Sequence, residues 1–187
     1  MKKKTTCTII EFKLIIKLLF KATLTYPQLA PSIPATMLWG PPGVGKSSST
    51  KQACEELGGK FIDSRLSQRD PVDLRGVPEI VDGKTVFRLP EELPREGHGI
   101  ILFDELSSCD PSLLVAAYEL ILDRRLGDYR VPPGFYIVAA GNRQEDRSVS
   151  RQMPAALANR FMHLEIEPDL QSVLNYLKEK GEFLNGL

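Results

Sequence analysis

The stretch at residues 36–50 constrains the fold most, because a short apolar run there leads into a glycine-rich turn and then a helix-forming segment. The phosphate-loop pattern G-x-x-x-x-G-K-[ST] is matched by Gly40, Gly45, Lys46 and Ser47. Glycines let backbone N–H groups turn towards phosphate oxygens, and the start of a helix favours negative charge. The alternative is a Gly/Pro loop that fits the pattern by accident, but the order strand, loop, helix favours a nucleotide-phosphate site.

Each residue type in this loop has an expected task. Lys46 would reach the β- and γ-phosphates, and Ser47 would offer its hydroxyl to Mg²⁺, which prefers oxygen ligands. The expected nucleotide-binding residues are Gly40, Pro41, Pro42, Gly43, Val44, Gly45, Lys46, Ser47, Ser48 and, from a second motif, Asp104.

This second motif is a run of four apolar residues at 100–103, which predicts a buried strand with Asp104 and Glu105 at its carboxyl end. Ligands of open parallel sheets bind outside that end. Asp104 would hold a water of the Mg²⁺ shell, and Glu105 would take a proton from an attacking water. Two acids after an apolar strand are weak evidence alone, but their position downstream of a phosphate loop makes them strong evidence.

A third candidate, Asn142, follows the apolar run at 135–140. An amide at this strand tip would hydrogen-bond both the γ-phosphate and the attacking water. The alternative is a turn-forming asparagine after Gly141.

Strands and helices are expected to alternate along the chain. The strands are predicted at 36–39, 100–103, 135–140 and 161–166, with a further short strand that begins at 61–62, and the helices at 45–57, 110–121, 154–159 and 169–180. This order predicts a three-layer α/β/α sandwich with a mainly parallel five-stranded sheet. At 187 residues one domain is expected, with a helix and linker at 1–35, a core at 36–168 and a C-terminal helix at 169–187.

The first twenty residues combine a basic start with apolar residues, as a signal peptide does. Glu11, Lys13 and Lys17 interrupt the apolar run, so we expect an amphipathic helix lying on the body and no membrane insertion. Binding to a membrane surface is the less favoured alternative.

Two hairpins are expected outside the core. Asp82-Gly83 lies between short apolar-containing runs at 77–88, and Gly127-Asp128 lies at the centre of 124–131. The first hairpin would touch a partner or would be an ordinary surface hairpin.

The composition limits the partners, the cellular location and the metal sites that we expect. Lys plus Arg and Asp plus Glu each number 24, so the net charge is zero and nucleic acid is an unlikely partner. Three cysteines without a C-x-x-C pair favour a reducing, cytoplasmic location. The two histidines lack nearby paired ligands, so no zinc site is expected.

The motifs at 40–47 and 101–105, followed in order by Asn142 and Arg160, resemble those of the AAA+ ATPases, and most closely the MoxR-like group. The resemblance implies a P-loop NTPase with ATP and Mg²⁺ as cofactors. It equates the motifs with Walker A, Walker B and sensor 1, and gives the catalytic residues as Glu105, Asn142 and Arg160.

Arg160 matches the place where such proteins carry an arginine finger, which acts on nucleotide held by a neighbouring subunit. The resemblance therefore implies a ring-type homo-oligomer, expected to be a hexamer. The alternative is a surface ion pair, and competing arginines are Arg143, Arg147 and Arg151. Family members also use loops like the two hairpins to grip clients, which implies an unidentified protein partner.

The chain departs from the family pattern in one respect. AAA+ proteins follow the core with a helical lid, whereas 19 residues follow Pro168 here, which leaves room for one helix. A truncated or missing lid, or one completed by another chain, would give weak nucleotide retention and slow hydrolysis in isolation. The function expected first is therefore ATP hydrolysis that remodels a protein partner. The alternative is a nucleotide-dependent binding switch with little hydrolysis.

Overall fold

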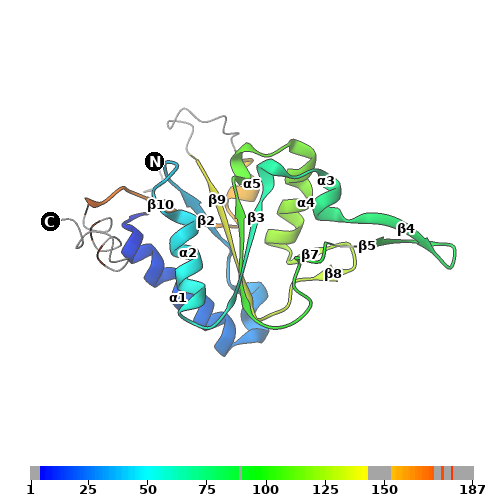
Figure 1. The fold of residues 1–187 in the computed structure, drawn as a ribbon, viewed down its shortest axis with the longest axis horizontal. Helices are drawn as coiled ribbons and strands as arrows, with labels where there is room; N and C mark the ends of the chain where they lie inside the picture. The colour runs from blue at the N-terminus through cyan, green and yellow to red at the C-terminus, as the bar shows by residue number, and fades with distance from the viewer. Residues whose placement is uncertain (1–4, 89, 143–152, 171–173, 175–177, 179–187) are drawn as a thin grey trace.

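The computed structural model describes residues 5–88, 90–142, 153–170, 174 and 178. Its central layer is a sheet with α1 (Ile9–Thr25) and α2 (Lys46–Glu55) on one face and α4 (Pro111–Leu122) on the other (Figure 1). This arrangement confirms the predicted three-layer α/β/α fold.

Six strands of the described residues form the sheet, and all neighbouring pairs are parallel. Their order is β1 (Thr6–Cys7), β10 (Met162–Ile166), β2 (Thr36–Trp39), β9 (Phe135–Gly141), β6 (Gly99–Asp104) and β3 (Lys60–Arg65). The sequence predicts five strands, and the additional one is β1, which pairs with β10 at the edge. A strand of two residues has no recognisable period, so only its pairing reveals it.

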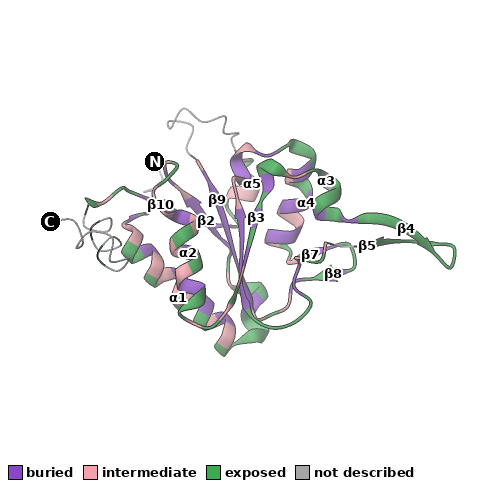
Figure 2. Cartoon of the chain, in the orientation of Figure 1, coloured by how far each residue is buried: buried purple, intermediate pink, exposed green. Residues whose placement is uncertain are grey.

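The middle strands are buried on both faces, as expected for a parallel sheet between two layers of helices. Along β6, Ile101 and Phe103 belong to the apolar cluster on the α4 side, whereas Ile100 and Leu102 belong to the cluster on the α1 and α2 side. Figure 2 shows buried strands between helices whose outer surfaces are exposed. The strands are therefore held firmly enough to fix the positions of residues at their ends.

Helix α1 has the amphipathic character that the sequence predicts. It begins at a capping box in which Thr8 accepts a hydrogen bond from the backbone N of Glu11, and the Glu11 carboxylate accepts one from the backbone N of Thr8. Its buried positions recur every four residues, at Phe12, Ile16 and Phe20. This spacing places one apolar stripe against the sheet.

Much of the linker that is predicted within residues 1–35 is helical. Helix α1 continues through residues 22–25, and the 3₁₀ helix η1 (Pro27–Ser32) follows it. Among the described residues, no helix has the length and apolar character that crossing a membrane requires.

An insertion between β3 and β6 carries the first predicted hairpin. Strands β4 (Val77–Val81) and β5 (Lys84–Arg88) pair antiparallel, and Asp82 and Gly83 in the turn have φ angles of 51° and 74°. Every residue of both strands is exposed, and the hairpin extends away from the body (Figures 1 and 2). The short helix α3 (Pro71–Arg75) precedes it and is not predicted from the sequence.

The second predicted hairpin is also present, as β7 (Arg125–Leu126) and β8 (Tyr129–Arg130). The short helix α5 (Ala155–Ala158) precedes β10, close to its predicted bounds. The helix predicted at 169–180 lies largely outside the described residues, and so does the segment in which a lid would begin.

Candidate active site

The phosphate-loop segment folds as its pattern predicts. Strand β2 ends at Trp39, the loop covers residues 40–45, and α2 begins at Lys46. Gly43 and Gly45 have φ angles of 79° and 97°, a region that other residues rarely adopt. A Cβ at Gly43 would meet no atom within 4 Å, so the backbone conformation, and not crowding, favours glycine there. The same segment contains the remaining candidates Gly40, Pro41, Pro42, Val44 and Ser48.

Lys46 lies against this loop with 8% of its surface exposed. Its Nζ donates to the backbone oxygens of Gly40 at 2.8 Å and Pro41 at 3.0 Å. It also donates to Oδ1 of Asn142 at 3.3 Å. A buried ammonium group requires such partners. Asn142 directly follows β9. Its contact with Lys46 therefore joins the end of this strand to the phosphate loop, and it brings together two residues that the sequence predicts from separate motifs.

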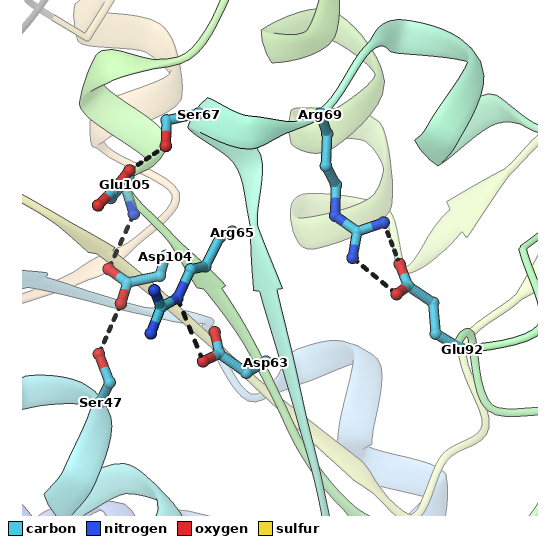
Figure 3. A network of polar contacts seen from close by, with 8 residues as sticks. All are labelled: Ser47, Asp63, Arg65, Ser67, Arg69, Glu92, Asp104 and Glu105. Atoms are coloured by element: carbon cyan, nitrogen blue, oxygen red, sulfur yellow. Dashed lines mark hydrogen bonds and ion pairs between the residues drawn. The ribbon is translucent and has the colours of Figure 1, made fainter.

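Ser47 and Asp104 meet beside this lysine. The Ser47 hydroxyl donates to Oδ2 of Asp104 at 2.5 Å, from the first turn of α2 to the last residue of β6 (Figure 3). The other oxygen, Oδ1, accepts a hydrogen bond from the backbone N of Glu105 at 2.8 Å. The predicted metal-binding pair is therefore assembled at the carboxyl ends of the strands.

The donor set at this pair fits Mg²⁺. A hydroxyl and a carboxylate are oxygen ligands, and Mg²⁺ in phosphate sites takes its remaining ligands from phosphate and water. Within the part of the chain that the structure describes, no group of three or more His, Cys, Asp or Glu side chains could hold a metal by itself.

Glu105 begins a left-handed turn directly after β6, with φ of 59° and ψ of 29°. Residues other than glycine rarely occupy this region, and those that do cluster at functional sites. Its carboxylate accepts a hydrogen bond from the hydroxyl of Ser67, in the 3₁₀ helix η2 (Leu66–Gln68). Figure 3 shows this carboxylate turned towards Ser67, away from Ser47. The two neighbouring acids therefore face different partners.

The backbone of Asn142 is fixed by Ser107, which lies in the 3₁₀ helix η3 (Leu106–Ser108). The buried Ser107 hydroxyl accepts a hydrogen bond from the backbone N of Asn142 at 3.2 Å and lies 3.4 Å from its carbonyl oxygen. The Asn142 side chain remains directed at Lys46.

Strand β3 adds charged groups beside Asp104, since the strand register pairs Arg65 with Asp104. Partial burial, and next the charge of Asp104, raise the pKa of the Asp63 carboxyl, while Arg65 acts in the opposite sense. The Arg65 Nε lies 3.6 Å from Oδ2 of Asp63 (Figure 3). The carboxylates of Asp63 and Asp104 therefore repel each other near the carboxyl ends of β3 and β6, and Arg65 offsets part of this effect on Asp63.

Arg160 lies near the amino-terminal ends of the strands, opposite the ends at which the phosphate loop lies. It precedes β10, whose first residue Met162 pairs with Thr36 at the start of β2, whereas the phosphate loop follows the end of β2. The four residues of β2, at about 3.3 Å each, separate the two ends of this strand by roughly 13 Å. Its guanidinium pairs with Asp123 at the end of α4 and is half exposed. Arg160 therefore does not join the site of its own chain. The competing arginines at 143, 147 and 151 lie outside the described residues.

Sequence reasoning misses Ser67 and Ser107. Ser67 lies 38 positions before Glu105, and Ser107 lies 35 positions before Asn142. Neither belongs to the phosphate-loop pattern or to the apolar strand with its two acids. The position of Ser107 two residues after Glu105 is the one signal for it, whereas the sequence offers none for Ser67.

The chain is similar to several known proteins. The family model described as "AAA domain (dynein-related subfamily)" matches residues 35–161. Lon protease of Porphyromonas gingivalis is 34% identical over 80 residues, which make up 41% of this chain and 10% of that protein. The crystal structure of a candidate ATPase from Cytophaga hutchinsonii matches with a TM-score of 0.60 and 19% identity, over 93% of this chain and 58% of that one.

The chain thus spans a tenth of the Lon protease and 58% of the Cytophaga protein. The second likeness shows the fold alone. The family model, in contrast, covers most of the chain and includes the phosphate loop, both acids of the second motif, Asn142 and Arg160. The chain therefore belongs to the AAA domain family, in its dynein-related subfamily.

Proposed function

We propose that this AAA domain binds ATP with Mg²⁺ and hydrolyses it. The observation that carries the proposal is the convergence of two contacts, Ser47 with Asp104 and Lys46 with Asn142, at the carboxyl ends of three adjacent strands. Ligands of parallel sheets bind at the carboxyl ends of the strands. The glycine conformations and the start of α2 support phosphate binding at the same place.

Each residue has a defined task in this proposal. Lys46 exchanges its backbone carbonyl partners for the β- and γ-phosphates, and Ser47 and Asp104 would hold Mg²⁺. The ion would neutralise charge on the phosphates. Asn142 holds the attacking water, and Glu105 takes its proton while the water oxygen bonds to the γ-phosphorus and the bond to the β,γ-bridging oxygen breaks. ADP and phosphate are the products.

We assign Arg160 to the site of a neighbouring chain in a hexameric ring. Its position near the amino-terminal ends of the strands, away from its own phosphate loop, supports action in trans. A planar cation at the γ-phosphate stabilises the charge that develops in the transition state. In the free chain Asp123 occupies this guanidinium, so assembly would exchange one anionic partner for another.

We place the chain in the MoxR-like group and propose that hydrolysis remodels a protein client. The insertion with α3 and the β4–β5 hairpin, and the smaller β7–β8 hairpin, support this assignment. The long hairpin exposes apolar side chains that suit contact with an unfolded or partly folded segment, among them Val77, Ile80, Val86 and Phe87. The side chains of the three cysteines are buried, and we propose a reducing cytoplasmic setting for the chain.

The test of hydrolysis is the substitution Glu105→Gln. It keeps the shape of the side chain and removes its ability to take a proton, so ATP binding should persist while turnover falls to background. The matched control is Glu119→Gln, on α4, where the partly exposed carboxylate lies 3.5 Å from the Nε of Arg125. Turnover at the wild-type rate in Glu105→Gln would contradict the assignment of Glu105.

A nucleotide-dependent switch is the second candidate. The observation that favours it is the Glu105 carboxylate, which is bonded to Ser67 and turned away from Ser47. A switch would show ATP-dependent binding of a protein partner with negligible turnover in the wild-type chain, at every protein concentration and with a partner present. Partner binding that requires ATP and is identical in Glu105→Gln would support this function.

A further inference from the structure

We propose that His163 is a positioning residue for Arg160. The His163 ring bridges Trp39, the residue before the phosphate loop, and the backbone carbonyl of Ala158, two residues before Arg160. The inference rests on the proposed function, because it requires Arg160 to serve the site of a neighbouring chain.

Both nitrogens of the His163 ring are engaged. Nε1 of Trp39 donates to Nδ1 of His163 at 2.8 Å, and Nε2 of His163 lies 2.6 Å from the carbonyl oxygen of Ala158. An indole N–H can only donate, so Nδ1 carries the lone pair and Nε2 carries the hydrogen. The ring is therefore neutral and donates from Nε2 to the carbonyl of Ala158.

The contact with Trp39 holds the His163 ring in one orientation. The two ring planes differ by 5° and their centroids lie 6.1 Å apart, so the indole N–H points along both planes at the lone pair of Nδ1. The ring of Phe161 packs on His163 at a tilt of 59°. Strands β10 and β2 are paired here, with His163 opposite Met37 and Trp39 two residues further along. The central sheet therefore provides a firm support for the ring.

The contact with Ala158 lies at a weak point of the chain. Helix α5 has four residues, which is too short to be stable in isolation. The last carbonyls of a helix have no partners inside it. That of Ala158 accepts one hydrogen bond from the His163 ring and a longer one, at 3.3 Å, from the backbone N of Phe161. The ring therefore ties the end of α5 to β10.

The position of Arg160 depends on this end of α5. Its backbone N donates to the carbonyl oxygen of Leu157 at 3.0 Å, so the turn that presents Arg160 continues directly from the helix. Its half-exposed guanidinium pairs with Asp123 in the free chain and would leave this partner for a neighbouring γ-phosphate. Its backbone then aims the guanidinium, and the His163 ring holds this backbone. A displacement of about 1 Å in a catalytic group can cost about a hundredfold in rate.

The first test compares three variants of His163 at a protein concentration that saturates assembly. His163→Ala should lower kcat for ATP by about ten- to a hundredfold, because Arg160 loses its support. His163→Gln places an amide N–H near the position of Nε2 and should retain most of the wild-type kcat. His163→Asn reaches Trp39 but not Ala158, so it should be as slow as His163→Ala.

Two further measurements make this comparison specific. The affinity for ATP, measured by calorimetry, should be unchanged in all three variants, since the phosphate loop is intact. The matched control is His98→Ala, which removes an exposed histidine before β6 and should leave kcat unchanged.

The second test determines on which site His163 acts. In a mixture of His163→Ala and Glu105→Gln chains, some sites combine an intact Glu105 with a well-placed Arg160 from the neighbour, so part of the turnover should recover. In a mixture of His163→Ala and Arg160→Ala chains, no neighbour offers a well-placed Arg160, and turnover should stay low. Recovery in the first mixture also requires that His163→Ala folds and binds ATP.

The third test observes the bridge without ATP. Trp39 is the one tryptophan of the chain, so its fluorescence reports its contact with His163. The emission maximum should shift in His163→Ala, which removes the acceptor. It should stay at the wild-type value in His163→Asn, whose Oδ1 takes the place of Nδ1. An unchanged maximum in His163→Ala would contradict the bridge.

The remaining outcomes separate this inference from the proposed function. A wild-type kcat in His163→Ala, or a higher kcat in His163→Asn than in His163→Gln, would overturn the positioning role. A loss of ATP affinity that accounts for the whole effect, or no recovery with Glu105→Gln, would place the effect at the chain's own phosphate loop and would also overturn it. If Glu105→Gln and Arg160→Ala chains do not restore each other either, sites are not shared, and the proposed role of Arg160 fails together with the inference.

Discussion

The hydroxyl of Ser47 lies 2.5 Å from Oδ2 of Asp104, although 57 positions separate the two residues in the chain. One begins a helix and the other ends a strand, and the parallel sheet brings these two ends together. Both oxygens are of the kind that Mg²⁺ prefers. This contact makes the metal requirement of the site testable.

Asp104→Asn should raise the Mg²⁺ concentration that half-saturates ATP turnover by about tenfold or more, because a neutral amide would replace the carboxylate that attracts the cation. Asparagine retains the size of the side chain and can still hydrogen-bond Ser47. The measurement is turnover across a Mg²⁺ titration. Asp82→Asn is the matched control, since the hairpin turn has a positive φ that asparagine accepts. An unchanged Mg²⁺ dependence in Asp104→Asn would exclude Asp104 from the metal site.

Lys46→Ala should weaken ATP binding by roughly ten- to a hundredfold, which corresponds to about 1.5–3 kcal/mol for a hydrogen bond to a charged group. The fluorescence of Trp39, the one tryptophan of the chain and the residue before the loop, provides the binding signal. The control is Lys51→Ala, on the same helix with an exposed side chain. Equal affinities of Lys46→Ala and Lys51→Ala would contradict the phosphate-binding role.

The free energy of unfolding should fall as the pH rises from about 9 to about 12. Burial raises the pKa of the Cys54 thiol to about 11 and that of the Tyr129 phenol to about 12. In this range the unfolded chain has lost protons that the folded chain still holds, so the free energy of unfolding decreases from its value below pH 9. Urea unfolding at a series of pH values measures this free energy. Cys54→Ala should reduce the dependence in the lower part of the range, and an unchanged slope in that variant would contradict the assignment.

The fold and most of the site can be predicted from local patterns. The phosphate loop, the buried strand before Asp104 and the Asp82-Gly83 turn each carry their signal within about ten neighbouring residues, which turn chemistry and apolar runs describe well. Their proximity in space follows from one further rule, that ligand sites gather at the carboxyl ends of parallel strands.

The remaining features depend on contacts between distant residues. Strand β1 exists because Thr6 and Cys7 pair with β10, and Ser67 matters because η2 packs beside Glu105. Nothing near Ser67 in the sequence distinguishes it from any exposed serine. The left-handed backbone at Glu105 cannot be predicted from the sequence either, because glutamate rarely adopts this conformation and the tertiary structure imposes it.

The position of Arg160 away from its own phosphate loop predicts that two inactive variants can restore each other. In a mixture of Glu105→Gln and Arg160→Ala chains, some sites combine an intact Glu105 from one chain with an intact Arg160 from its neighbour. Mixing should therefore recover part of the wild-type turnover, measured against each variant alone. Variants that stay inactive when mixed would contradict sites shared between chains.

The measurement that tests the central claim most directly is ATP turnover per chain as a function of protein concentration, with Mg²⁺ present and Arg160→Ala measured in parallel. We predict that the specific rate of the wild-type chain rises with concentration, and that Arg160→Ala lowers the rate of the assembled protein by about a thousandfold or more. A rate near zero at every concentration in both proteins, with ATP still bound, would contradict the account and identify a nucleotide switch.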